Sequence, residues 1–398
     1  MKVYEIGTGY TSIPARMGAA TEIVVEELTK AMLKKGLDVE IIDIEAKDRL
    51  PHSLPIREVK VPGVFTGTDV QLGLMHKLKR VVYSVALAQK LMQILKKSKE
   101  TVVLHFHNQY NLFFFLKLVP AGIRKKARIA YTNHSYIWHG AWEEIKDTVH
   151  KRYFQEVYCM KHADYVYVLN EQTRENVVAH LQVLPERVHL VDNGVNVDVY
   201  RSLSAEEKAE VQAQLGLEGK QVLLHVGSVC ERKNQLEAVR LMLPIMQKDP
   251  DIVFCYAGGL IDQEYQQSIV RFAEENQVAG QVRYLGEVKP GEVLNRIYNC
   301  AEAMIFPSKA EGFSLVIIEA MAAGLPVVIN QTLRFSLEED CLRYAEDAAF
   351  RQIVETTILD ADSRDRMSER VREAVVKKYS WYQIAEDYIR TWECAFCK

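Results

Sequence analysis

The chain has 398 residues, enough for two domains with separate cores, and its 48% hydrophobic and 26% charged content is ordinary for a globular protein. Its formal net charge of −3 gives no general case for nucleic-acid binding. The charge is uneven, because residues 1–198 carry 27 Lys and Arg against 22 Asp and Glu, whereas residues 199–398 carry 23 against 31. Basic clusters at 76–80 and 124–128 fit an anionic partner or a membrane surface, but solvent-exposed helix and loop positions explain them better.

Targeting signals are not evident in the sequence. The first residues predict a strand rather than a signal peptide, and no apolar run approaches the ~18 residues of a membrane span. The seven cysteines are scattered and form no disulfide framework. These features predict a cytoplasmic protein, with the inner face of a membrane as a second possibility because of the basic clusters.

Strands and helices alternate through the first half of the chain. The expected strands lie at 3–7, 39–44, 101–107, 128–133, 165–170 and 188–192, and the expected helices at 19–35, 76–97, 110–119, 142–161 and 171–180. Residues 50–67 hold three prolines and no apolar period, so we expect a connection without regular structure. This alternation predicts a parallel, doubly wound sheet.

The turn after the first strand is a near match to a dinucleotide-binding fingerprint. It reads Gly7-Thr-Gly9-Tyr-Thr-Ser12, and Asp43 follows at the end of the second strand. Ser12 replaces the third glycine, however, and Pro14 intervenes before the helix. Both departures argue against an NAD-dependent dehydrogenase.

The second half repeats the alternation. Its expected strands lie at 222–226, 252–256, 282–285, 303–306 and 327–329, and its helices begin near Gln235, Asp262, Gly291 and Ser314. Two more helices are expected at 363–378 and 381–396. We therefore predict a first domain at 1–197, a second at 198–379 and a C-terminal helical segment at 380–398. Trp381, Ile384, Tyr388 and Trp392 recur at helical spacing and predict that this last helix docks through one apolar face.

Residues 302–329 form the most informative stretch, with the order strand, polar turn, helix, strand. Glu311 precedes the helix and Glu319 lies on it, and eight helical residues rise roughly 12 Å. Between them lies the helix N-terminus, with the free amides of Phe313, Ser314 and Leu315, which attracts an anion such as a diphosphate. One element can thus reach the sugar, the phosphates and the ribose of a nucleotide sugar.

The string PSKAEGFSLVIIEAMAAGLPVV resembles the Glu-x7-Glu signature of glycosyltransferase family 4, a large family of retaining enzymes. The resemblance implies the α/β GT-B architecture, in which two Rossmann-like, doubly wound domains face a cleft and the C-terminal helix crosses back to the first domain. It also implies a nucleotide-sugar donor and no cofactor or catalytic metal. In this family Glu311 would hold the donor sugar and Glu319 the ribose hydroxyls.

Two first-domain positions match family motifs. Residues 16–22 resemble a Gly-Gly-x-Glu loop whose backbone approaches the donor phosphates or the acceptor, and Gly18 is the position carried over. His134, in Thr-Asn-His-Ser, matches a Thr-x-His at a strand tip. The resemblance implies that His134 makes a polar contact with the donor sugar or its β-phosphate.

The second domain carries the remaining matches. In the turn 227–234, Arg232 and Lys233 match the cations that take the diphosphate charge, and Gly227 opens the turn. Ser228 stands where the family usually has Arg. Two glycines match loops that frame the nucleotide: Gly258 and Gly286. After Val328 the chain departs from the family, with residues 330–338 in place of a Gly-Gly…Glu loop.

Metal sites are not predicted. His105 and His107 project to one face of a strand, but no third ligand stands at a recognisable spacing, so packing or contact with a ligand is the better interpretation. Asp360 and Asp362 mimic a metal-binding Asp-x-Asp, yet they precede a helix and are expected to cap it.

The sequence therefore predicts a retaining, metal-independent glycosyltransferase, with Glu311, His134, Arg232 and Lys233 as catalytic residues. The donor would be a UDP- or GDP-linked sugar, and the acceptor a hydroxyl of a glycan, a lipid-linked molecule or a small molecule. Two alternatives remain open, a GT-B nucleotide-sugar epimerase that needs no acceptor and a non-catalytic coat or scaffold protein of this fold. The base, sugar, acceptor, linkage and oligomeric state are not specified by the sequence.

Overall fold

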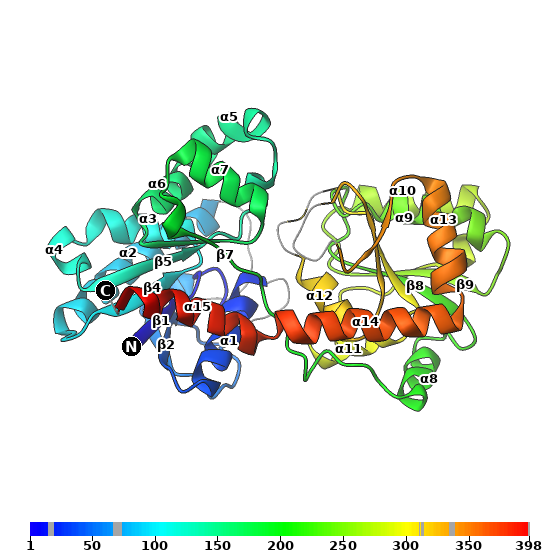
Figure 1. The fold of residues 1–398 in the computed structure, drawn as a ribbon, viewed down its shortest axis with the longest axis horizontal. Helices are drawn as coiled ribbons and strands as arrows, with labels where there is room; N and C mark the ends of the chain where they lie inside the picture. The colour runs from blue at the N-terminus through cyan, green and yellow to red at the C-terminus, as the bar shows by residue number, and fades with distance from the viewer. Residues whose placement is uncertain (15–19, 67–73, 310, 312–313, 334–338, 397–398) are drawn as a thin grey trace. The chain divides into compact units, whose positions relative to one another are not determined.

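The computed structural model describes residues 1–14, 20–66, 74–309, 311, 314–333 and 339–396. They form two compact units, each built around its own parallel sheet (Figure 1). Unit 1 comprises Met1–Gly194 and Trp381–Lys398, and unit 2 comprises Val195–Ser380. The sequence placed these boundaries at 197 and 379. None of the helices among the described residues combines the length with the apolar character that a membrane span requires.

Unit 1 contains a seven-stranded parallel sheet in the order β3-β2-β1-β4-β5-β6-β7. Its strands are β1 (Lys2–Ile6), β2 (Asp38–Ile44), β3 (Ile56–Val59), β4 (Val102–Phe106), β5 (Ala127–Thr132), β6 (Tyr165–Val168) and β7 (Val188–Leu190). The strand order reverses between β1 and β4, and open sheets of this kind bind ligands outside the carboxyl ends of the strands at such a point.

Helices cover both faces of this sheet. They are α1 (Ala20–Lys34), α2 (Leu74–Lys97), α3 (Gln109–Leu118), α4 (Ala121–Arg124), α5 (Trp142–Arg152), α6 (Phe154–His162), α7 (Glu171–Leu181) and α15 (Trp381–Phe396). The main core of the unit lies between one sheet face and the helices α2, α3, α6 and α7. Helices α1 and α15 pack side by side on the opposite face.

The C-terminal helix α15 docks on unit 1 as its apolar spacing predicted. Tyr388 and Trp392 are buried, and the Tyr388 hydroxyl lies 3.1 Å from Thr132 Oγ1 at the end of β5. Thr391 Oγ1 lies 2.7 Å from the hydroxyl of Tyr167 on β6. The helix therefore belongs to the unit that begins with the first residue of the chain.

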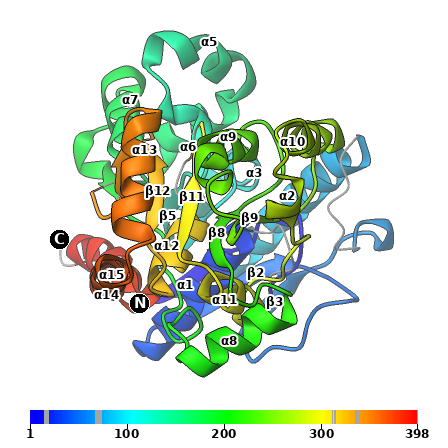
Figure 2. The same ribbon diagram turned by 90° about the vertical axis from the view of Figure 1, so that its right-hand side faces the viewer.

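Unit 2 contains a six-stranded parallel sheet in the order β10-β9-β8-β11-β12-β13. Its strands are β8 (Gln221–Val226), β9 (Ile252–Ala257), β10 (Val282–Tyr284), β11 (Ala303–Phe306), β12 (Val327–Asn330) and β13 (Leu342–Tyr344). Its helices are α8 (Ala205–Gln214), α9 (Gln235–Met246), α10 (Gln263–Glu275), α11 (Glu292–Asn299), α12 (Leu315–Ala322), α13 (Asp347–Ile353) and α14 (Ala361–Tyr379). Helices α9, α10 and α13 cover one face, with α9 beside α10 (Figure 2), and α8, α11, α12 and α14 cover the other.

The structure corrects three sequence predictions. The connection at 50–67 contains strand β3, which pairs with the edge of β2. The expected helix at 142–161 is two helices, because the backbone of Tyr153 leaves the helical region at φ −116° and ψ 22°. Helix α8 and the edge strand β13 were not predicted. Both edge strands are short and only partly buried, so their sequences carry little periodic signal.

Candidate functional site

In unit 2 the loops that follow β8, β9 and β10 lie in a row at the carboxyl ends of the strands. Gly227 N donates to Ala257 O at 2.9 Å, and Gly258 N donates to Gly286 O at 2.8 Å. Gly258 has φ +145°, and a Cβ placed there would lie 2.1 Å from the carbonyl oxygen of Gly227. Only glycine fits this contact, so the three predicted glycines form one backbone surface.

The turn between β8 and α9 is tied to the loop after β11. Asn234 adopts a left-handed conformation at φ 61°, and its side-chain amide donates to Pro307 O at 3.1 Å. Lys309 N donates to Arg232 O at 3.0 Å. In the same turn the Ser228 carbonyl accepts a hydrogen bond from the Gln235 amide at 3.0 Å. These contacts bring the turn that carries Arg232 and Lys233 against the loop that carries Glu311.

Glu311 lies at the centre of a buried charge cluster. Its Oε1 atom accepts from Arg232 Nη1 at 3.0 Å, Lys233 Nζ at 2.7 Å and Ser308 Oγ at 2.5 Å. Glu311 and Lys233 are 8% and 9% exposed, whereas the Arg232 side chain is 40% exposed. Burial lowers the pKa of Lys233, and the Glu311 carboxylate opposes that shift. The structure thus joins three predicted residues, and sequence reasoning missed Ser308 although it lies in the Pro-Ser of the recognised string.

Helix α12 begins directly after this cluster. Ser314, which precedes the helix, is buried, and its hydroxyl has no hydrogen-bond partner among the described residues. The first amides of a helix also lack intrahelical acceptors, so this end offers donors to an anion. The helix begins at Leu315, one residue after the start predicted at Ser314. Phe313 lies outside the described residues, as does Gly18.

Glu319 has a different set of partners from Glu311. It is buried on α12, where it accepts from the Tyr298 hydroxyl at 3.2 Å and also hydrogen-bonds to Tyr200. Burial raises the pKa of Glu319 to about 7, and the two tyrosine hydrogen bonds oppose the shift. The Tyr200 hydroxyl in turn accepts from Gly291 N at 3.0 Å. Neither tyrosine belongs to a motif, so no pattern in the sequence pointed to them.

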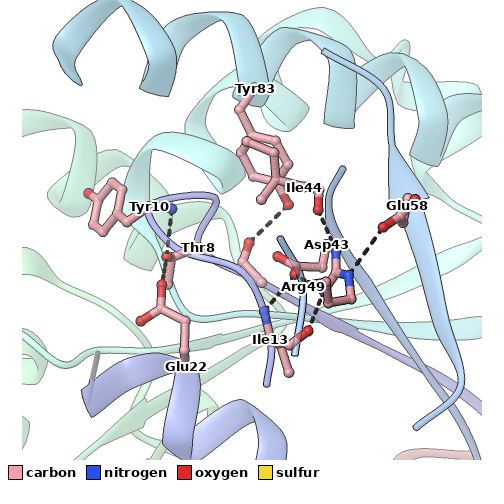
Figure 3. Close-up of polar contacts among 10 residues, drawn as sticks. Thr8, Tyr10, Ile13, Glu22, Asp43, Ile44, Arg49, Glu58 and Tyr83 are labelled. Carbon is pink, nitrogen blue, oxygen red and sulfur yellow. Dashed lines mark hydrogen bonds and ion pairs between the residues drawn. The ribbon is translucent and has the colours of Figure 1, made fainter. Parts of the chain in front are cut away.

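In unit 1 the loop after β1 is held by buried polar groups (Figure 3). Asp43 Oδ2 accepts from Ile13 N at 2.8 Å and from Arg49 Nη1 at 2.8 Å. Asp43 is fully buried, so its carboxylate is not available to a ribose. This finding supports the rejection of a dinucleotide-binding site at Gly7.

The same loop is fixed at its start by two further contacts. The Tyr83 hydroxyl of α2 donates to Gly7 O at 3.1 Å, and Thr8 hydrogen-bonds to Glu22 on α1 (Figure 3). Tyr10 N donates to Thr8 Oγ1 at 3.1 Å. The conformation of this loop is therefore set largely by side chains from β2, α1 and α2.

The predicted residue His134 contacts His107, one of the two strand-end histidines. Its Nε2 lies 3.0 Å from His107 Nδ1, and His107 Nε2 lies 2.9 Å from Glu5 Oε2. His105 Nδ1 lies 3.0 Å from the other oxygen of Glu5. Burial lowers the pKa of His107 to about 4 and that of His134 well below its usual value. Glu5 was not predicted, because a single acidic residue in an apolar strand belongs to no motif.

One group in the described part of the chain has the spacing of a metal site, with the ligand atoms of Glu5, His105 and His107 within 4.8 Å of one another. Each of these atoms already takes part in a hydrogen bond with another member of the group. Ionised carboxylate and neutral imidazole account for these contacts without a metal.

Two family models match the chain. The model described as Glycosyltransferase Family 4 matches residues 21–199, and the one described as Glycosyl transferases group 1 matches residues 207–337. Among curated relatives, the chain is similar to the uncharacterized glycosyltransferase MJ1607 of Methanocaldococcus jannaschii, with 22% identity and 96% of each chain covered. It is also 31% identical to a D-inositol 3-phosphate glycosyltransferase of Mycobacterium sp. (strain KMS), over 42% of this chain and 37% of that one.

Solved structures show the same fold. The sucrose-phosphate synthase of Thermosynechococcus elongatus gives a TM-score of 0.76 at 19% identity, over 100% of this chain and 99% of that one. Starch synthase IV of Arabidopsis thaliana, bound to ADP and acarbose, gives 0.76 at 15% identity over 100% of both chains. Anabaena HepE in complex with UDP-glucose gives 0.70 at 14% identity, over 99% and 100%.

Proposed function

We propose that this chain, a glycosyltransferase with the GT-B fold, transfers a hexose from a nucleoside-diphosphate sugar to an acceptor hydroxyl with retention of configuration and without a metal. The observation that carries the proposal is the cluster of Glu311, Arg232 and Lys233 at the start of α12. Two cations share one carboxylate there, so the cluster has a surplus positive charge next to the positive end of a helix.

This surplus charge suits the diphosphate of a donor. As the glycosidic bond breaks, negative charge builds on the departing phosphate oxygen, and cations already in place stabilise it without reorganisation. Lys233 is held by Glu311, and Arg232 is half-exposed and can reach a ligand. The amide of Leu315 and the unpartnered hydroxyl of Ser314 add neutral donors. Since protein groups meet the charge, the proposed reaction requires no metal.

The two carboxylates take different parts of the donor in this proposal. Glu311 would grip hydroxyls of the hexose beside the breaking bond, and Glu319 would accept hydrogen bonds from the ribose, together with Tyr200 and Tyr298. The backbone surface made by Gly227, Gly258 and Gly286 would lie against the base and the phosphates. The departing phosphate oxygen would take the acceptor proton, so no strong protein base is needed.

The donor is proposed to be UDP- or GDP-linked. Similar structures are complexes with UDP-glucose and with ADP, which supports a nucleoside-diphosphate ligand, and experiment must identify the base. The acceptor is proposed to be a glycan, a lipid-linked molecule or a small molecule, and a lipid-linked acceptor would place the enzyme at the inner face of a membrane.

The first test is thermal stabilisation by UDP-, GDP- and ADP-sugars. A ligand present at about a hundred times its dissociation constant should add about 2.7 kcal/mol to the stability. The stabilising donor is then incubated with candidate acceptors, and the anomeric proton coupling of the product reports retention or inversion. Activity should persist in EDTA, and a loss that magnesium or manganese restores would contradict metal independence. An isomerised donor formed without an acceptor would indicate an epimerase instead.

A further inference from the structure

A chain of buried hydrogen bonds runs beneath the carboxyl edge of the unit 1 sheet and ends at His134. It starts at Glu5 on β1, which is in register with His105 on the neighbouring strand β4. Both side chains are fully buried, and the rings of Tyr388 and Trp392 on α15 lie 5.0 Å and 5.7 Å from the His105 ring. A carboxylate inside a parallel sheet requires donors on its oxygens.

The Glu5 carboxylate has a donor on each oxygen. His105 Nδ1 lies 3.0 Å from Oε1, and His107 Nε2 lies 2.9 Å from Oε2. Burial by itself would raise the pKa of Glu5, but the two imidazoles outweigh it and lower the pKa to about 2. An ionised carboxylate only accepts hydrogen bonds, so the nitrogen that faces each oxygen must carry a proton.

This requirement propagates from His107 to His134. His107 is neutral at neutral pH, because burial lowers its pKa to about 4. A neutral imidazole has one N–H, and His107 uses its N–H at Nε2, toward Glu5. Its Nδ1 is therefore a lone pair, and it accepts a hydrogen bond from His134 Nε2 at 3.0 Å. The ring planes of His107 and His134 are inclined to each other by 24°. Their centroids lie 5.3 Å apart, and this separation exceeds the N···N distance by about one ring width. The rings thus meet edge to edge, which suits an N–H···N bond.

The other arm of the chain stays inside the unit. His105 Nε2 lies 2.7 Å from Thr132 Oγ1, which lies 3.1 Å from the Tyr388 hydroxyl. His105 and Thr132 are fully buried, and Tyr388 is buried on the face of α15 that packs on unit 1. By contrast, His134 is half-buried just beyond the end of β5. Among the described residues, the arm through His107 is therefore the one that leads from Glu5 toward the edge where ligands of such sheets bind.

We propose that Glu5 and His107 are positioning residues that hold His134 as the neutral tautomer with its proton on Nε2, so that Nδ1 offers a lone pair to a substrate hydroxyl. The nature of that substrate rests on the proposed function. A nitrogen lone pair accepts from an O–H but repels a phosphate oxygen. His134 is therefore assigned to a sugar or acceptor hydroxyl and not to the diphosphate. The resemblance had implied a contact with either the donor sugar or its β-phosphate, and the proposal excludes the β-phosphate.

The direct test is the tautomeric state of the histidines in the full-length enzyme, read at neutral pH from two-bond ¹H–¹⁵N correlations after selective histidine labelling. Signals are assigned with His134→Gln and His107→Gln variants. We expect His107 and His134 to be neutral with the proton on Nε2 in both. A proton on Nδ1 of His134, or a charged His134 ring, would overturn the proposal, and so would stoichiometric zinc in the purified protein. This measurement needs no activity, so its outcome is independent of whether the proposed function holds.

The functional test uses His107→Phe, which keeps an aromatic ring and removes both hydrogen bonds. Loss of one positioned hydrogen bond predicts a fall of roughly ten-fold in kcat/KM. Tyr388→Phe is the matched control, because it cuts the internal arm only and should leave kcat/KM and the His134 tautomer unchanged.

His107→Phe also leaves one oxygen of a buried carboxylate without a donor. If that variant does not fold, the double variant Glu5→Gln/His107→Phe removes the charge as well and is measured in its place. Unchanged kcat/KM in a folded variant that has lost the His107 contacts would refute the positioning role. An equal loss in Tyr388→Phe would also refute it, because it would point to general disturbance of the buried network.

Discussion

The buried carboxyl of Glu319 allows us to predict how the free energy of unfolding depends on pH. Its pKa is raised from 4.5 to about 7, chiefly by burial. Between these two values the folded protein keeps a proton on Glu319 that the unfolded chain has released. The folded state then binds more protons than the unfolded state, so the free energy of unfolding must fall as pH rises through this window.

The magnitude follows from the size of the shift. Each pKa unit corresponds to about 1.4 kcal/mol, so the full effect is about 3 kcal/mol, absent well below pH ~4.5 and complete above pH ~7. Glu319→Gln removes the ionisation, and its amide can still accept from Tyr298 and donate to Tyr200. The stability of the variant relative to the wild type should therefore rise by about 2–3 kcal/mol between pH ~5 and pH ~8.

The assay is denaturant unfolding of both proteins across this pH range. Glu156→Gln is a matched control in unit 1, because burial raises the pKa of Glu156 to about 7 as well, with hydrogen bonds from Trp138 and Tyr131. It should flatten the pH dependence in the same way and leave the donor KM unchanged, whereas Glu319→Gln should raise that KM. Parallel pH curves for wild type and Glu319→Gln would refute the reasoning, since the raised pKa would then not exist in the folded protein.

Three further predictions concern catalysis, the glycine loops and the C-terminal helix. Glu311→Ala should mainly lower kcat and Glu319→Ala should mainly raise the donor KM, each by roughly ten- to a hundred-and-fifty-fold. If donor kinetics show that both variants raise KM alone, Glu311 has no catalytic role. Gly258→Ala should lower the unfolding free energy by about 2 kcal/mol or more, because its Cβ would collide with a backbone carbonyl, whereas Gly280→Ala, with open space around it, should show no such loss. Trp392→Ala should cost about 3–5 kcal/mol through the cavity left under α15, and a variant as stable as wild type in denaturant would contradict its buried packing on unit 1.

The sequence alone determined the architecture, because the patterns that predict strands and helices lie within short segments of the chain. The alternation of apolar strands with helical periods predicts two parallel sheets, and both are present. The string around Glu311 identified the strand–turn–helix unit for the same reason, since all its residues lie within one short segment. The spacing of Trp381, Ile384, Tyr388 and Trp392 likewise predicted which face of the last helix is buried.

The tertiary structure decided which distant side chains meet. Glu5 reaches His105 across 100 residues, and Lys233 reaches Glu311 across 78. Asp43 lies near the end of the second strand, where a dinucleotide-binding protein has the acidic residue that binds ribose. In this structure its carboxylate instead accepts hydrogen bonds from Arg49 and from the backbone of Ile13. Alternation of strands and helices does not specify the order of strands in a sheet, and that order places β1 beside β4. A buried ionisable group takes its charge and tautomer from the partners that this order supplies, so its chemistry cannot be predicted before the strands are placed.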